Sequence, residues 1–277
     1  MKKIIATAVA MAFAAPVMAA DITITGDQEF SWQSNNGATT ASLDGDVNVK
    51  ASTETANGLS VSADINISEV GGDDGGASLT VGGPFGKVDL GDTSSAVDAI
   101  DDTTDWGYVL TQGSPNADAA VLWTLPSMVP GLSVYVSAAA DGNDGAAQVG
   151  GAAHNGMAVK YSVGGLSVRY GQNDFDAGNE TALVAVTYGV GGLSAAIETH
   201  TATAADGTEV DTETVGLTYT MGDLTAAVET MENGTNDFTT LGVHYGLGGG
   251  VTAFIETTED DNDDTAETMA VGVTMKF

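Results

Sequence analysis

The chain of 277 residues contains no cysteine and only seven basic residues against 38 acidic ones. Without cysteine, no disulfide can support an exported domain with a small core. A formal net charge of −31 makes nucleic acid an implausible partner, because phosphates would be repelled. No stretch after the N-terminal region offers the roughly 18 consecutive apolar residues that a transmembrane helix needs. Stability and any membrane attachment must therefore come from another architecture.

Residues 1–20 have the organisation of an export signal, with two lysines, an apolar core and a small-residue end. We expect cleavage after Ala19 or Ala20, so that residues 21–277 form the mature protein. Its formal charge is 5 − 38 = −33, because two of the seven basic residues are removed. An exported chain without a helical anchor is periplasmic, secreted, or an outer-membrane barrel.

The hydrophobic content is only 43%, and 37 residues are glycine. In water this composition, combined with the acidic excess, predicts marginal packing or disorder. In a bilayer it suits a β-barrel, because one face of each strand meets lipid and the other meets water. The composition therefore favours the barrel.

Short glycine-bearing turns recur about every thirty residues, as at Gly164-Gly165 and Gly191-Gly192, and each opens a strand of alternating apolar and polar residues. The strands that enter such turns carry an aromatic ring on their apolar face. These rings are Tyr161, Tyr188, Tyr219, Tyr245 and Phe277. Placed side by side, they predict an aromatic girdle at one membrane interface. A soluble β-sandwich also alternates, but it has no reason to keep its rings at one height.

The same rule predicts an all-β fold, a 16-stranded antiparallel transmembrane β-barrel. The expected strands are residues 22–33, 39–55, 59–69, 76–82, 86–92, 119–125, 132–140, 153–163, 166–173, 181–190, 193–202, 212–220, 224–232, 237–247, 251–259 and 265–277. The connections alternate between short and long, and the longest covers residues 93–118. Because outer-membrane barrels have short periplasmic turns and longer outer loops, we expect the long acidic set to face outward.

Two features resemble the general Gram-negative porins, particularly the alphaproteobacterial, Rhodobacter-like ones. The last strand ends in Phe277, and the stretch GGPFGKVDLGD at residues 82–92 runs into the long acidic loop. The resemblance implies an integral outer-membrane protein, usually a homotrimer among lipid and lipopolysaccharide, with a water-filled channel for small hydrophilic solutes. It also implies that loop 93–118 folds inward as a constriction loop.

The resemblance further implies that carboxylates of this loop line one side of the constriction. The candidates are Asp98, Asp101, Asp102 and Asp105. The family's opposite wall normally bears several basic residues. The mature chain departs from that pattern, since its only basic residues are Lys50, Lys87, Lys160, Arg169 and Lys276. We therefore expect an acidic lumen and not one polarised across its waist.

Strand parity assigns the positions between the apolar residues to the lumen. The expected pore-lining wall comprises Asp27, Glu29, Asp44, Asp46, Lys50, Asp64, Lys87, Asp89, Lys160 and Arg169, and the same parity places Glu198, Glu229, His244 and Glu256 inside. A carboxylate excess concentrates cations within about 8–10 Å, so a cation-preferring pore is expected. In the alternative, the acidic residues mostly keep the outer loops solvated and contribute little to selectivity. Lys160 and Arg169 either form a basic patch or neutralise neighbouring carboxylates.

Other functions have less support in the sequence. No G-x-S-x-G or comparable arrangement indicates an outer-membrane enzyme, and the three histidines follow no metal-binding spacing. We expect no cofactor, although the acidic stretches 73–74 and 259–264 could bind Ca²⁺. The alternatives are a structural or adhesive barrel without an open channel and a soluble β-sandwich.

Overall fold

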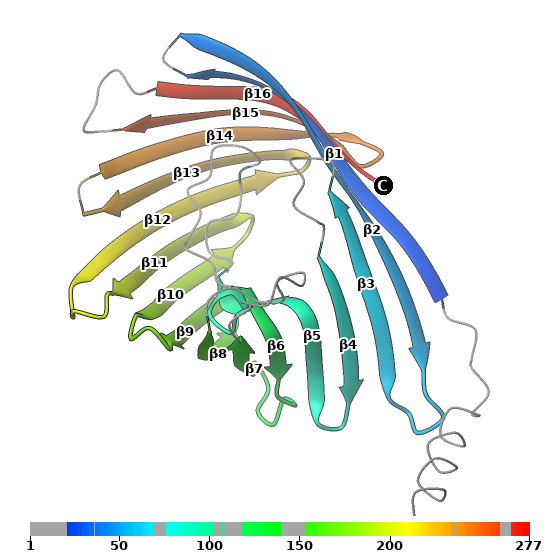
Figure 1. Ribbon diagram of the computed structural model, residues 1–277. Coiled ribbons are helices and arrows are strands. Elements are labelled where there is room, and N and C mark those ends of the chain that lie inside the picture. Colours follow the sequence, from blue (N-terminus) through cyan, green and yellow to red (C-terminus); the bar gives the residue numbers. More distant parts are fainter. Residues whose placement is uncertain are drawn as a thin grey trace, which may run out of the picture.

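A computed structural model describes residues 21–35, 37–68, 76–101, 107, 118–139, 153–234, 236–260 and 267–277. They form sixteen antiparallel strands in one closed barrel, in which each strand pairs with its sequence neighbours and β1 pairs with β16 (Figure 1). The strands are β1 Asp21–Asn35, β2 Ala38–Glu54, β3 Ser60–Ser68, β4 Ala77–Gly83, β5 Gly86–Ser94, β6 Asp118–Thr124, β7 Leu132–Ala139, β8 His154–Val163, β9 Leu166–Phe175, β10 Glu180–Val190, β11 Leu193–Thr203, β12 Glu209–Met221, β13 Leu224–Asn233, β14 Asn236–Gly248, β15 Val251–Asp260 and β16 Glu267–Lys276.

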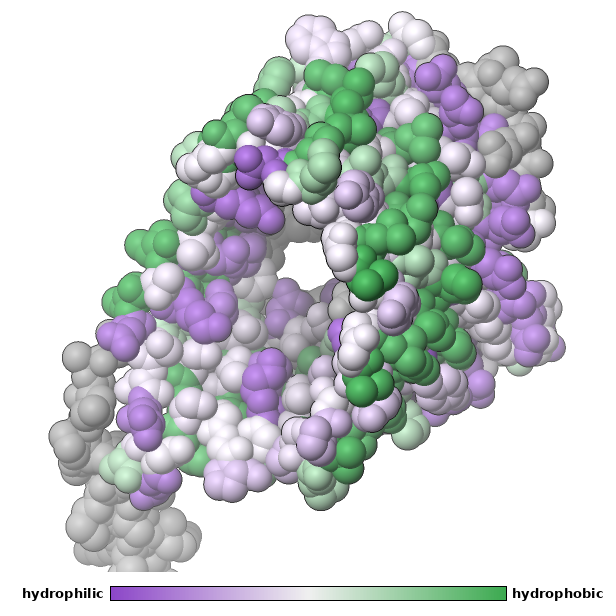
Figure 2. Space-filling view, turned by 180° about the vertical axis from the view of Figure 1, so that it is seen from behind, coloured by the Kyte–Doolittle hydropathy of each residue, from purple (hydrophilic) through white to green (hydrophobic). Residues whose placement is uncertain are grey.

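The strands keep the alternation of the sequence. In β10, Val184, Val186 and Tyr188 are 41–49% exposed on the outer face, whereas Leu183 and Ala185 are buried on the inner face. Figure 2 shows hydrophobic residues gathered in a band on the outside of the wall, beside an opening that leads through the molecule. The apolar surface is thus on the outside, as a lipid environment requires.

Two-residue turns join β4 to β5, β8 to β9, β10 to β11, β12 to β13 and β14 to β15 at one end of the barrel. Gly164 and Gly165 have φ values of 56° and 88°. Both values lie in the left-handed region, which the favoured type I′ hairpin turn requires at its two central positions. The glycine pairs recognised in the sequence therefore set the spacing of the hairpins.

The barrel closes where the first strand meets the end of the chain. The N–H of Gly26 donates to the carbonyl oxygen of Phe277 and the N–H of Phe277 donates to that of Gly26, both at 2.9 Å. From Asp27 onward β1 pairs with β16. None of the helical residues in the described ranges forms a segment long and apolar enough to cross a membrane.

The prediction of a sixteen-stranded antiparallel barrel is confirmed. The strand ends agree with the expected ranges to within three residues, and the largest difference is at the start of β12. This strand begins at Glu209 and not at residue 212, because Glu209–Asp211 continue the pairing with Thr201–Thr203 of β11. The polar sequence there gives no apolar alternation from which the extension could be recognised.

Candidate functional site

An acidic wall lines one side of the lumen. Asp27 of β1 is the cross-strand partner of Asp46 of β2, and Glu29 is the partner of Asp44. Together with Lys276, these four carboxylates border a pocket of about 280 Å³ that Gly107 also lines. Like charges in direct cross-strand positions repel each other. This part of the wall therefore favours a cation at its surface.

Two wall lysines are paired with wall carboxylates. Lys50 Nζ lies 3.7 Å from Asp64 Oδ2 on β3, and Lys87 Nζ lies 2.8 Å from Asp89 Oδ2 on the same strand. The hydroxyl of Thr80 also donates to Asp89 at 2.6 Å. Lys50 and Lys87 therefore neutralise neighbouring carboxylates of the wall.

The segment from Ser95 to Asp101 lies inside the barrel and contains the 3-10 helix η1, Asp98–Ile100. Its apolar side chains pack on the inner faces of β6, β8 and β10 in one buried cluster. The cluster comprises Ala96, Val97, Ile100, Leu122, Ala158, Leu183 and Ala185, with Tyr135 of β7 against it. Burial of this apolar surface holds the segment on the wall.

Three polar contacts fix the same segment to β7 and β9. The N–H of Ala96 donates to Ser137 Oγ at 2.9 Å, and Asn173 Nδ2 donates to Ser95 Oγ at 3.1 Å. Arg169 Nη1 donates to the carbonyl oxygen of Ile100 at 3.0 Å. The segment is thus held at its start by two side chains and at its end by a guanidinium.

Inner-face glycines let the segment approach the wall closely. A Cβ at Gly171 of β9 would lie 3.1 Å from Val97 Cγ2 and 3.2 Å from Ile100 Cδ1. A Cβ at Gly156 of β8 would meet the side chains of Asn173 and Ser137. The segment therefore rests almost directly on the backbone of β8 and β9.

The same loop reaches the opposite wall within a few residues. Asp101 is the last residue of the segment seated on β6–β10, whereas Gly107 borders the acidic pocket of β1, β2 and β16. The difference of 107 − 101 = 6 residues allows a span of about 20 Å at most. Two described parts of this loop, residues 95–101 and Gly107, therefore lie at opposite walls of the lumen.

The four carboxylates expected in the loop are only partly described. Asp98 lies in η1 and is half-buried, and Asp101 follows it. Asp102 and Asp105 lie outside the described residues. Burial raises the pKa of Asp98 above its ordinary value of 3.8; a hydrogen bond with Ser94 opposes this shift and the charge of Asp118 adds to it.

The remaining basic wall residues differ in exposure. Lys160 is partly exposed on β8, and Arg169 is its direct cross-strand partner on β9. Arg169 is 1% exposed and lies beneath the loop. Its second nitrogen, Nη2, donates to Thr187 Oγ1 of β10 at 2.6 Å. Arg169 has the inward parity expected, but it contacts the loop and not the water of the pore.

A row of glutamates continues the acidic wall across β11, β13 and β15. Glu198, Glu229 and Glu256 are each 1% exposed on the inner face. Glu256 Oε1 lies 2.9 Å from His244 Nε2 on β14. These side chains are at the inward positions that parity assigns to them.

The aromatic side chains expected to form the girdle all lie on the outer face and are 42–58% exposed. Each precedes a short turn or the end of the chain by no more than a few residues. The set is Tyr161, Tyr188, Tyr219, Tyr245 and Phe277. Their common position at the turn end of the barrel is compatible with an interfacial belt.

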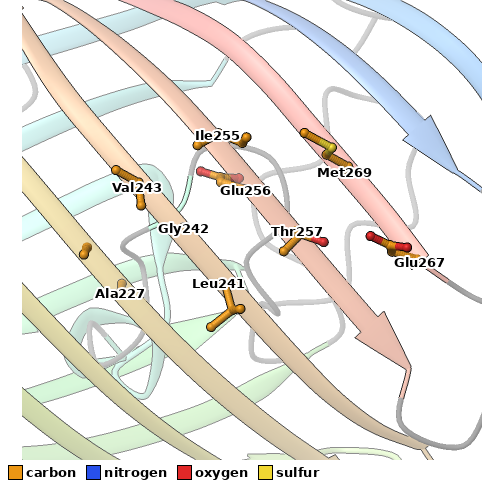
Figure 3. A pocket seen from close by; sticks show the side chains of 10 residues that line it. Ala227, Leu241, Gly242, Val243, Ile255, Glu256, Thr257, Glu267 and Met269 are labelled. Carbon is orange, nitrogen blue, oxygen red and sulfur yellow. The ribbon is translucent and has the colours of Figure 1, made fainter. Parts of the chain in front are cut away.

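A shallow groove of about 470 Å³ lies on the outer face of β13–β16. Leu241, Val243, Ile255 and Met269 border it (Figure 3). These side chains are exposed on the apolar side of their strands, so the groove belongs to the membrane-facing surface and not to the lumen.

Within the described ranges, no group of three or more His, Asp or Glu side chains is arranged to hold a metal ion. Most of the two acidic stretches considered for Ca²⁺, residues 73–74 and 259–264, lies outside those ranges.

Sequence reasoning missed the apolar patch on the inner wall. Leu122 and Leu183 face inward, where parity predicts polar residues. A signal was available, since residues 119–123 and 182–186 are continuous apolar runs and not alternating ones. Such runs indicate strands that are buried on both faces. Here the second face is covered by the loop.

Comparison with known proteins places the chain in a family. Residues 6–265 match the family model described as Gram-negative porin. The chain is a member of the Gram-negative porin family. It is therefore a non-enzymatic channel protein of the Gram-negative outer membrane. A search of curated proteins found no significant match.

Solved porin structures share the fold of this porin. A porin structure refined at 1.8 Å resolution has a TM-score of 0.71 at 20% identity, and the match covers 93% of this chain and 100% of that one. A loop-deletion mutant of OmpT from Vibrio cholerae has a TM-score of 0.76 at 18% identity, with coverages of 94% and 100%. A mutant of the Rh. blastica porin has a TM-score of 0.69 at 17% identity, with coverages of 93% and 100%.

Proposed function

We propose that this porin forms a water-filled channel for the passive diffusion of ions and small hydrophilic solutes, and that the channel prefers cations. The observation that carries the proposal is the acidic wall of β1 and β2, where Asp27, Glu29, Asp44 and Asp46 line a pocket with Gly107 of the loop. Ions that cross this side of the lumen pass these carboxylates. A Debye length of about 8 Å at physiological salt is long enough for their field to act there.

The test is the reversal potential of the purified protein in a planar bilayer with a KCl gradient. A D44N/D46N variant should shift the reversal potential toward that of a non-selective pore. The matched control is E213Q/E232Q, because Glu213 and Glu232 are cross-strand partners on the outer face. It removes the same charge and should leave the potential unchanged. Anion preference of the wild-type channel would overturn the cation selectivity.

The second candidate is a structural or adhesive barrel without an open channel. Single-channel recording separates the two, since a closed barrel gives no conductance steps. Homotrimer formation is part of the proposal and is supported by the trimer form recorded for the structurally similar OmpT of Vibrio cholerae. We also propose that outer-membrane lipid and lipopolysaccharide surround the barrel and that residues 1–20 are removed on export.

A further inference from the structure

We infer that Arg169 is a positioning residue that sets the width of the channel by holding residues 95–101 against the wall. The inference rests on the proposed channel function. Arg169 carries a charge that strand parity would place in the pore, but its side chain is 1% exposed beneath the loop. A passing ion therefore meets the loop and not the guanidinium.

The contacts of Arg169 point in two directions. Nη1 donates to the carbonyl oxygen of Ile100 in the loop, and Nη2 donates to Thr187 Oγ1 on the wall strand β10. Only a planar fork of donors spans two such acceptors at fixed geometry, which distinguishes arginine from lysine. The guanidinium thus links the end of the seated segment to the barrel.

Because Arg169 is buried, Arg169 and the loop segment each depend on the contact between them. A buried guanidinium is costly unless its donors are satisfied and its charge is compensated. The loop supplies the Ile100 carbonyl and the nearby charge of Asp101, and the wall supplies Thr187 and the charge of Glu198. If the segment leaves the wall, Arg169 loses its loop partner at the same moment. The pair therefore favours one position of the loop.

The apolar seat alone does not select that position. Val97 and Ile100 pack on Gly171 and Ala158, whose small side chains offer no projections that would fix one position. Hydrophobic contact is also non-directional. The hydrogen bonds of Ser137 and Asn173 hold the start of the segment. Arg169 is the contact that fixes its end, at Ile100 next to Asp101.

The first experiment records single channels of R169M, R169K and a control, K50M. Both Arg169 variants should show a several-fold increase in open-channel current noise, because the loop moves between positions. K50M removes a wall charge whose partner is Asp64, so it should shift the reversal potential without added noise. If R169K shows the same current noise as wild type, the planar guanidinium is not what holds the loop in place. Wild-type noise in R169M with a shifted reversal potential would overturn the positioning role.

The second experiment does not depend on conduction. The chain has no cysteine, so A96C introduces a single thiol at a position that is 0% exposed. Maleimide should label the A96C thiol many-fold faster in the R169K background than in the wild-type or K50M background. Equal labelling rates would overturn the inference. R169K keeps the charge and so preserves the folded barrel, should R169M fail to form one.

The third experiment is a rescue. The N–H of Ala96 donates to Ser137 Oγ at 2.9 Å, so the two positions are neighbours, and A96C/S137C in the R169K background is designed to link the loop to the wall by a disulfide. Oxidation should return the current noise to the wild-type level and reduction should restore the excess. If the excess noise persists in the oxidised form, movement of the loop is not its source. A wild-type channel without any conductance steps would instead refute the proposed function, and the labelling rates would still decide the role of Arg169.

Discussion

At the scale of single residues, the protonation of Asp98 connects the loop to pH. Burial raises the pKa of Asp98 above 3.8, which means that the folded protein favours the neutral carboxyl. The stabilising contribution of the neutral form is present at low pH and is lost as the pH rises through the raised pKa. The negative charge of Asp98 is correspondingly lost on acidification at a higher pH than for an ordinary aspartate.

We therefore expect the D98N variant to differ from wild type in reversal potential at neutral pH and to converge with it as the pH falls toward 3.8. The measurement is the reversal potential as a function of pH. D206N is the control, because hydrogen bonds from Thr208 lower the pKa of Asp206 in its exposed outer turn. Because Asp206 stays charged in wild type through this window, the D206N curve should run parallel to that of wild type. Parallel curves for wild type and D98N would show that Asp98 does not titrate there.

At the scale of elements, the close contact between η1 and β9 depends on Gly171. In a G171L variant, the new side chain would lie where Val97 and Ile100 now pack, and would push the segment toward the lumen. Overpacking of this kind costs about 1–3 kcal/mol. We expect a lower single-channel conductance and a reduced midpoint of unfolding in urea.

The matched control is G189L, on the inner face of the adjacent strand β10. The nearest atom to a Cβ at Gly189 is 3.8 Å away, so the side chain has room. Conductance should then stay close to the wild-type value. An equal fall in both variants would mean that added bulk, and not displacement of the loop, narrows the pore.

The strands were predictable from the sequence, but the position of residues 95–101 on the inner wall was not. Alternation and paired glycines, such as Gly164-Gly165, are local signals, and they identify every strand of the barrel. The contact of Arg169 with Ile100 joins residues 69 positions apart. Parity gives the face on which Arg169 lies, but it contains no information on which part of that face the loop covers. The buried state of Arg169 therefore required the three-dimensional structure.

At the scale of the whole molecule, a closed barrel has no free edge only while its first and last strands stay paired. Gly26 and Phe277 exchange two backbone hydrogen bonds at this seam. The ring of Phe277 also lies against Gly26, where a Cβ would be 2.7 Å from Phe277 Cζ. The last residue of the chain thus contributes both backbone pairing and side-chain contact to closure.

These two contributions can be separated. F277A keeps the hydrogen bonds and removes the ring, whereas deletion of Phe277 removes both. Each backbone hydrogen bond contributes about 0.5–1.5 kcal/mol, so deletion should lower the free energy of unfolding by about 1–3 kcal/mol more than F277A does. Urea unfolding in detergent micelles, followed by tryptophan fluorescence, measures the difference. If both variants unfold at the same urea concentration, the contribution of Phe277 comes from its ring, and its backbone pairing with Gly26 contributes nothing to closure.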